Sequence, residues 1–249
     1  MEQRTDKNSY TIIFAIGMVL GVGALLAFLA SSLKPMITEN ERLEKQQNIL
    51  YAMGVNDNDE SSATFVSTAD APELFNQYIK QQLEVQGGKP VENDQAYLID
   101  VKKEQAKAKN GETRRLPLFV GEKDGNTFYI APIRGKGLWD AIWAYVALDE
   151  NMVVQGAFFD HKGETPGLGA NIKQRFFMDD FIGEHLLSST GAFKGINVAK
   201  GNADPKNNDK TDNEVDAIAG ATITGDGVTA MIKKDLKLYL PYFESLKGK

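Results

Sequence analysis

The chain has 249 residues, a formal net charge of −6 at pH 7, no cysteine and two histidines. The lack of cysteine excludes disulfides, thiolate metal sites, iron–sulfur clusters and a cysteine nucleophile within this chain, and two histidines exclude a histidine-rich metal site. The sequence has no basic run and no basic excess, so nothing indicates binding to nucleic acid. We therefore expect no metal site within this chain, and any redox chemistry would depend on an organic cofactor or on metals held by another subunit.

The first predicted element is an apolar helix near the N-terminus. No charged residue lies between positions 8 and 33, and this run is long enough to cross a hydrocarbon core of about 30 Å. A cleaved signal peptide is the alternative, but the length of the run and the acids Glu2 and Asp6 before it favour a retained anchor. Arg4 and Lys7 in the short tail favour a tail inside the cytoplasm. We expect a single-pass protein of a bacterial inner membrane whose soluble part lies on the periplasmic side.

A connecting region follows the apolar helix. Residues 36–53 and 73–85 carry apolar positions at helical spacing and predict two helices. Residues 56–62 are rich in Asn, Asp and Ser and predict a loop between them. The predicted organisation is therefore a tail and membrane anchor at 1–34, a helical and irregular connecting region at 35–95, and a soluble domain at 96–249.

The soluble domain is predicted to begin near Ala96 and to consist mainly of strands. Apolar and β-branched runs separated by turn residues predict strands at 97–101, 116–120, 126–131, 143–148, 152–159 and 193–198. Helices are predicted at 172–187 and 228–243, and a polar loop at 201–214. Runs of strands with few inserted helices indicate an α+β fold with a largely antiparallel sheet.

Two glycine-containing stretches are candidate binding sites. In the first, Trp139 follows the glycine-rich turn 135–138 at the start of a strand. In the second, residues 164–169 surround Glu164 and Thr165 with glycine and proline, which gives a loop of sharply defined backbone with free N–H groups. Taken alone, each stretch is also consistent with a purely structural role, as a core tryptophan after a loop or a tight loop between strands.

The third candidate stretch, residues 216–224, is a turn of small residues before the predicted C-terminal helix. Small residues allow the backbone to approach another group closely. The free N–H groups and the dipole of a helix start favour an anion such as a phosphate. A threonine in this position is also common as a simple N-cap, so Thr222 could serve only to begin the helix.

The residue order in this stretch, Asp-x-x-x-Gly-Ala-Thr-x-Thr, resembles the motif at which a flavin transferase attaches FMN through a phosphoester. The resemblance makes Thr222 the acceptor, and Ala219 stands where that family most often has Ser or Thr. With the stretches 135–139 and 164–169 in the same order behind one anchor, the chain resembles the C subunits of the sodium-translocating NADH:quinone oxidoreductases. The same FMN-binding domain occurs in the G subunit of the Rnf complex.

The resemblance implies a membrane-anchored electron carrier with FMN bound covalently to Thr222. Its partners would be the other membrane subunits of a complex that moves electrons from NADH to ubiquinone and exports sodium, together with the flavin transferase during maturation. No Gly-x-Gly-x-x-Gly follows a predicted strand, so NADH is expected to bind elsewhere in the complex. The alternatives are the G subunit of an Rnf-type ferredoxin:NAD oxidoreductase, and a flavin-free anchored binding protein.

The same resemblance assigns roles to individual residues. Trp139 and Leu168 would pack near the flavin ring, and Glu164 and Thr165 would hydrogen-bond its polar atoms or its ribityl chain. Lys200, just before the polar loop, would neutralise the phosphate or a flavin anion. The remaining expected cofactor-binding residues are Gly167, Gly220, Ala221, Ile223 and Thr224.

Overall fold

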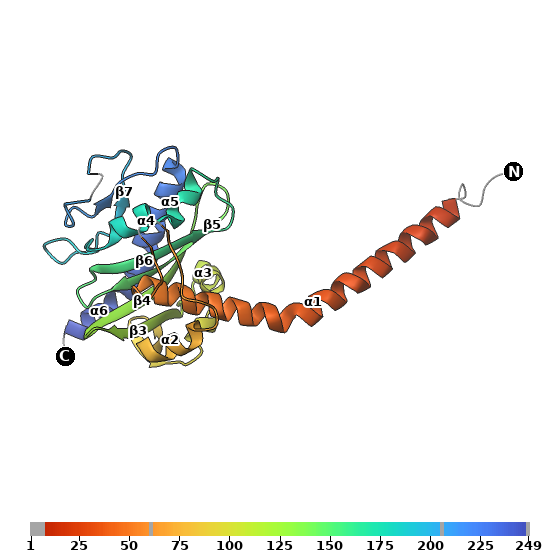
Figure 1. Ribbon diagram of the computed structural model, residues 1–249, viewed down its shortest axis with the longest axis horizontal. Coiled ribbons are helices and arrows are strands. Elements are labelled where there is room, and N and C mark those ends of the chain that lie inside the picture. Colours follow the sequence, from red (N-terminus) through yellow and green to blue (C-terminus); the bar gives the residue numbers. More distant parts are fainter. Residues whose placement is uncertain (1–7, 60–61, 205–206, 248–249) are drawn as a thin grey trace. The chain divides into compact units, whose positions relative to one another are not determined.

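The computed structural model describes residues 8–59, 62–204 and 207–247, and it divides into the units Met1–Leu43 and Glu44–Lys249 (Figure 1). The helix α1 (Asn8–Ala52) is continuous through this boundary and contains Pro35. Its large apolar side chains from Tyr10 to Ile37 are exposed. Among the described residues it is the one helix long and apolar enough to cross a membrane, with a mean hydropathy of 2.7 over its most apolar window.

The second unit is built on a six-stranded antiparallel sheet in the order β2-β1-β3-β4-β5-β6. The strands are β1 (Ile79–Gln86), β2 (Lys89–Glu92), β3 (Leu116–Lys123), β4 (Asn126–Lys136), β5 (Ala141–Leu148) and β6 (Val154–His161). A separate parallel pair joins β7 (Asn197–Val198) to β8 (Glu214–Val215). The predicted α+β class with a largely antiparallel sheet is confirmed.

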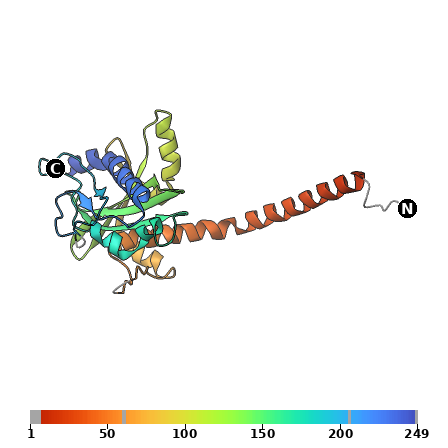
Figure 2. The same cartoon turned by 90° about the horizontal axis from the view of Figure 1, so that it is seen from above.

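Short helices complete the second unit. The α-helices are α2 (Ala71–Tyr78), α3 (Val101–Lys109), α4 (Arg175–Met178), α5 (Thr222–Asp235) and α6 (Leu240–Lys247). The 3-10 helices are η2 (Ala96–Leu98), η3 (Gly169–Lys173), η4 (Asp179–Phe181) and η5 (Leu236–Tyr239). Figure 2 shows α5 and α6, in blue, on the side of the sheet opposite the last turns of α1.

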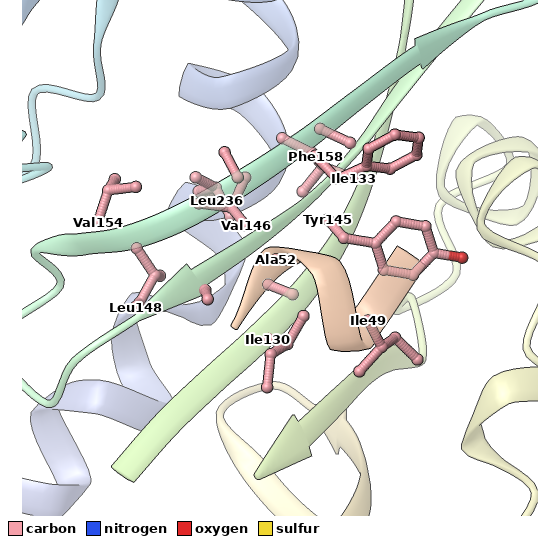
Figure 3. Close-up of a cluster of buried hydrophobic side chains, with 14 of the residues drawn as sticks. Ile49, Ala52, Ile130, Ile133, Tyr145, Val146, Leu148, Val154, Phe158 and Leu236 are labelled. Carbon is pink, nitrogen blue, oxygen red and sulfur yellow. The ribbon is translucent and has the colours of Figure 1, made fainter. Parts of the chain in front are cut away.

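Both faces of the sheet are covered. Consecutive strand residues point to opposite faces, and in β6 Phe158 packs against Tyr51 of α1 while Phe159 packs against Phe177 of α4. Figure 3 shows Ile49, also on α1, beside the strands in one part of this core. Burial on both faces explains why β5 reads as a nearly continuous apolar run, with seven of its eight residues buried.

The strand predicted at 97–101 is wrong. This segment forms η2 and the first residue of α3, although its residues favour a strand. Asp100 decides the outcome locally, because its carboxylate accepts hydrogen bonds from the N–H groups of Lys102 and Lys103 at 2.9 and 3.2 Å. This is the bonding of a helix N-cap, which satisfies donors that the first turn leaves without partners.

The helix predicted at 73–85 is correct only up to Tyr78, after which the chain continues as β1. Leu83 and Val85 are buried, and β1 pairs with both β2 and β3. Tertiary pairing therefore overrides a local pattern that fits either structure. The sequence placed the start of the soluble domain near residue 96. The sheet and the hydrophobic core already include this earlier segment.

Two further predicted elements are shorter than expected. The helix predicted at 172–187 is divided into η3, α4 and η4, which end at Phe181. The strand predicted at 193–198 is reduced to the two residues of β7. In contrast, the strands predicted at 143–148 and 152–159 correspond to β5 and β6, which lie next to each other in the sheet.

Candidate functional site

The three candidate stretches meet at the carboxylate of Glu164. Its Oε1 accepts a hydrogen bond from the N–H of Trp139 at 3.0 Å, and its Oε2 accepts one from the Thr224 hydroxyl at 2.6 Å. The N–H groups of Leu138 and Asp140 also lie close enough to stabilise the charge of this carboxylate. Glu164 is only 5% exposed. One buried side chain therefore joins the turn after β4, the loop after β6 and the start of α5.

The environment of Glu164 favours its ionised form. Burial alone would raise the pKa of this carboxyl, but the hydrogen bonds from Thr224 and from the turn N–H groups together hold its pKa below the ordinary value. The N–H of Glu164 itself donates to His161 Nδ1 at 3.1 Å, which fixes the start of the loop. Gly169 closes the arrangement, because a Cβ at that position would overlap Glu164 Oε2 and Thr224 Oγ1.

These contacts show which groups Glu164 bonds within the chain. The sequence led us to expect that it hydrogen-bonds polar atoms of a flavin. In the structure both carboxylate oxygens are engaged by donors of the chain itself. We assign Glu164 to holding the three stretches in place, and we assign Thr224 to the same internal link.

Thr222 lies in a different environment from Thr224. It is the first residue of α5 and is exposed, whereas Thr224 is buried at 2% exposure. The backbone reverses just before it at Gly220, whose φ of +72° favours glycine. The first N–H groups of a helix have no partner within the helix. The Thr222 hydroxyl and these N–H groups are thus positioned to receive a phosphate.

Exposed apolar side chains surround this helix start. Trp139 and Ile223 are 66% and 56% exposed, and Leu138 and Leu168 are also exposed. The Trp139 Nε1–H donates to the Thr165 hydroxyl at 3.2 Å, which orients the indole ring toward the loop. Leu168 lies next to the turn, since a Cβ at position 220 would be 2.8 Å from its Cδ2. Exposed apolar groups gathered in this way are typical of a surface that a ligand or partner covers.

The other predicted site residues have clear positions. Gly167 adopts a φ of +76° within the loop, and Ala221 is the residue that immediately precedes α5. The backbone around Lys200 runs beside residues 215–217, because the Ala199 N–H donates to Val215 O and the Ala217 N–H to Gly201 O. The Lys200 side chain is exposed, and among the described residues no recorded contact joins it to the Glu164 cluster or to Thr222.

Sequence reasoning missed the bond between Glu164 and Thr224 and the exposure of Leu138. The first has no local signal, since 60 positions separate the two residues. The exposure of Leu138 did have a local signal, because Gly-x-Gly-Leu-Trp places two large apolar side chains in a turn too short to bury both. Among the described residues, no group of three or more His, Asp or Glu could hold a metal ion.

Comparison with known proteins identifies the family. The model of the FMN-binding domain matches residues 137–237, a range that contains the second and third stretches and the part of the first stretch that contacts Glu164. The C subunit of the Na(+)-translocating NADH-quinone reductase of Pseudomonas aeruginosa is 30% identical over 240 residues, covering 91% of this chain and 90% of that protein. The chain belongs to this family of reductase C subunits. The corresponding protein of Neisseria meningitidis serogroup A is 27% identical, and the match covers the whole of this chain and 98% of that protein.

Solved structures of the family have the same fold. The crystal structure of the C subunit from Parabacteroides distasonis matches with a TM-score of 0.71 and 33% identity, over 85% of this chain and 96% of that one. NqrC of Shewanella oneidensis matches with a TM-score of 0.65 and 25% identity, over 84% and 99% of the respective chains. The resemblance proposed from the sequence is confirmed at the level of the family.

Proposed function

We propose that this chain is the electron-transfer subunit of a sodium-translocating NADH:quinone oxidoreductase and carries FMN covalently on Thr222. The observation that carries the proposal is the contrast between two hydroxyls of one helix turn. Thr222 is exposed at the helix start, whereas Thr224 is buried and bonded to Glu164. Membership of the C-subunit family and the match to the FMN-binding domain model support the cofactor.

The residues present fit FMN. The first-turn N–H groups of α5 suit the phosphate, and the exposed side chains of Trp139, Leu168 and Ile223 offer an apolar surface to the ring. When bound, FMN supplies the capacity to accept and release electrons one at a time. Glu164 contributes by keeping the turn, the loop and the helix start in register, so that the ring surface and the attachment point stay together.

Attachment requires a flavin transferase that uses FAD. The Thr222 oxygen forms the new bond to the phosphorus of FMN, its proton is released, and AMP leaves from FAD. An exposed hydroxyl at the end of a helix can enter the active site of another enzyme, whereas the Thr224 hydroxyl is enclosed by Glu164 and the loop. We therefore propose Thr222 as the acceptor.

We further propose that α1 is retained as a membrane anchor and that the second unit lies outside the cytoplasm. The uncharged run in the first half of α1 supports a span, and Arg4 and Lys7 before it favour a cytoplasmic tail. Protease added to spheroplasts should digest the soluble part. Digestion only in inverted vesicles would reverse this topology, and an N-terminus at Ser31 or later would mean cleavage.

Substitution of the two threonines tests the attachment site. In cells that contain the transferase, Thr222→Ala should give a chain without covalent flavin, seen as loss of in-gel fluorescence and of the FMN mass in the intact chain. Thr224→Ser keeps the hydroxyl that Glu164 requires and should retain the flavin. A flavin on Thr222→Ala would refute the assignment.

The same measurement separates the rival functions. A flavin-free binding protein predicts no added mass on the wild-type chain even when the transferase is present. The G subunit of an Rnf complex would carry the flavin but would assemble with a complex that oxidises ferredoxin. The relatives that cover most of this chain are named as C subunits of the quinone reductase, which favours that complex.

A further inference from the structure

A cavity of about 460 Å³ lies between α3, the end of β4 and α5, and it is lined by cations. We call it the basic groove and define it by Lys102, Lys109, Arg134, Lys136 and Lys234. The remaining lining residues are uncharged, and they include Gln105 and Met231. A groove of this charge contrasts with the net charge of −6 on the whole chain.

Helical spacing on two helices brings the lysines at positions 102, 109 and 234 together. Lys102 and Lys109 are seven residues apart on α3 and therefore project from the same face of that helix. Arg134 and Lys136 share one face of β4, opposite to the face on which Gly135 meets Met231 of α5, so they border the groove at the end of the strand rather than pointing toward α5. Lys234 lies in the last turn of α5, which forms the facing wall.

In the part of the chain that the structure describes, no acid is recorded in an ion pair with the four lysines of the groove. Asp235 forms a buried ion pair with Arg114 at 2.7 Å, and its other oxygen accepts hydrogen bonds from Gln105 and from the Arg134 N–H. Asp140 pairs with Lys162 at 2.9 Å, and the nearby charge of Arg134 also helps to lower the pKa of this carboxyl, so Arg134 is partly offset. Among the described residues, no ion pair is recorded for any of the five cations that define the basic groove. Lysines that line one cavity without ion-pair partners produce a local positive potential.

The basic groove adjoins the flavin site proposed above. Lys136 immediately precedes the turn that carries Trp139, and α5 begins at Thr222 and continues into the groove wall. Gly227 allows α5 to lie directly against the end of β4, because a Cβ at position 227 would overlap the carbonyl oxygen of Lys136 and lie 3.4 Å from the Cα of Gly137. A molecule seated in the groove would therefore lie beside the turn and the helix that present the cofactor.

We propose that the basic groove docks an acidic surface of the subunit that exchanges electrons with this chain. The proposal rests on the proposed function. The four lysines are exposed and have long flexible stems, so each would lose side-chain entropy if it were fixed around a small anion. Exposed charges at an interface chiefly accelerate and orient association with a surface of opposite charge, which suits an electron carrier that must meet its partner repeatedly.

Charge-neutralising variants test the docking. The test variant replaces Lys102, Lys109 and Lys234 with Gln. The control variant replaces Lys89, Lys194 and Lys237, which are exposed and lie outside the groove, with Gln. Both lower the net charge by three, so they differ only in the place of the change. Each full chain, purified in detergent with its flavin, is added to the complex purified from a strain that lacks this subunit.

The association rate is then measured by biolayer interferometry over a series of NaCl concentrations. The wild-type rate should fall steeply as salt rises, because salt screens attraction between exposed charges. At low salt the groove variant should associate about tenfold more slowly and depend less on salt, while the control variant stays within about twofold of wild type. Equal rates for the two variants would overturn the proposal.

Lysine labelling identifies the occupant. An amine-reactive reagent should modify Lys102, Lys109 and Lys234 in the isolated chain but much less in the assembled complex, with Lys89 labelled in both. If inorganic pyrophosphate protects the three lysines in the isolated chain while assembly does not, the groove is a phosphate site and the proposal is refuted. The covalent FMN mass, measured on every sample, reports separately on the proposed function.

Discussion

Replacement of Glu164 by Gln should destabilise the soluble unit by breaking the link between the three site stretches. Gln keeps the shape but replaces one acceptor oxygen with an NH₂ group that faces donors. The carboxylate accepts from the Thr224 hydroxyl and from N–H groups of the turn around Trp139. A hydrogen bond to a charged group contributes about 1.5–3 kcal/mol, and a buried donor left unpaired adds to the loss. We expect the free energy of unfolding to fall by about 2–4 kcal/mol.

Thermal unfolding measures this effect. A domain of this size loses about 2–4 °C in Tm for each kcal/mol, so Glu164→Gln should melt roughly 5–15 °C lower than wild type. The control is Glu150→Gln, which removes the same charge at an exposed position. Trp139 emission should change in the Glu164 variant, because its backbone N–H loses its acceptor. Equal melting temperatures for the two variants would refute the role assigned to Glu164.

The pH dependence gives an independent check. Because the pKa of Glu164 is lower in the folded state than its ordinary value of 4.5, the ionised carboxylate stabilises the fold above that value. The contribution is lost as pH falls through the folded pKa. The difference in stability between wild type and Glu164→Gln should therefore be constant at neutral pH and shrink below pH 4.5. A difference that persists undiminished in strong acid would show that it arises from packing rather than charge.

Three further predictions concern other sites. Arg114→Met should lower the free energy of unfolding, measured in urea, by about 3–5 kcal/mol, because it leaves Asp235 buried without its cation. The double variant Arg114→Met with Asp235→Leu should recover most of this loss. Burial raises the pKa of Glu184 to about 7. Between pH 4.5 and 7 the folded state therefore keeps a proton that the unfolded state has released, and the free energy of unfolding should fall as pH rises through this window. Glu184→Gln should flatten that dependence and be more stable than wild type at pH 8 by on the order of 3 kcal/mol. Leu168→Ala should shift the visible spectrum or the reduction potential of the flavin while leaving its attachment intact, and an unchanged spectrum and potential would place this side chain away from the ring.

The sequence predicts best the elements whose local pattern agrees with their tertiary surroundings. The apolar runs that become β5 and β6 are buried on both faces, so no alternative element competes with a strand. The segment at 97–101 fails because a single carboxylate, that of Asp100, caps the following helix. The segment at 73–85 fails because β1 is selected by pairing with β3, whose partner residues lie more than 30 positions away.

The candidate site shows the same division between local and distant information. Its three stretches could be recognised because each contains glycines where the backbone turns tightly, as Gly167 and Gly220 do with positive φ. The contact that unites them could not be recognised, since it joins a loop residue to a hydroxyl of a helix much later in the chain. The basic groove was missed for a related reason, because no helix was predicted over residues 102–109 and the lysines there were not expected to share a face.

The geometry of α5 explains how one short motif can hold two threonines with the different roles proposed above. Residues two apart on a helix are separated by about 200° around its axis, so Thr222 and Thr224 point to nearly opposite sides. The side that faces the loop receives Thr224, which satisfies a buried carboxylate, and the outer side receives Thr222. A shift of one residue in the start of the helix would disturb both positions at once. The internal bond of Thr224 to Glu164 therefore also fixes the direction of the Thr222 hydroxyl, and any variant that weakens this bond should make attachment at Thr222 less efficient before it abolishes the fold.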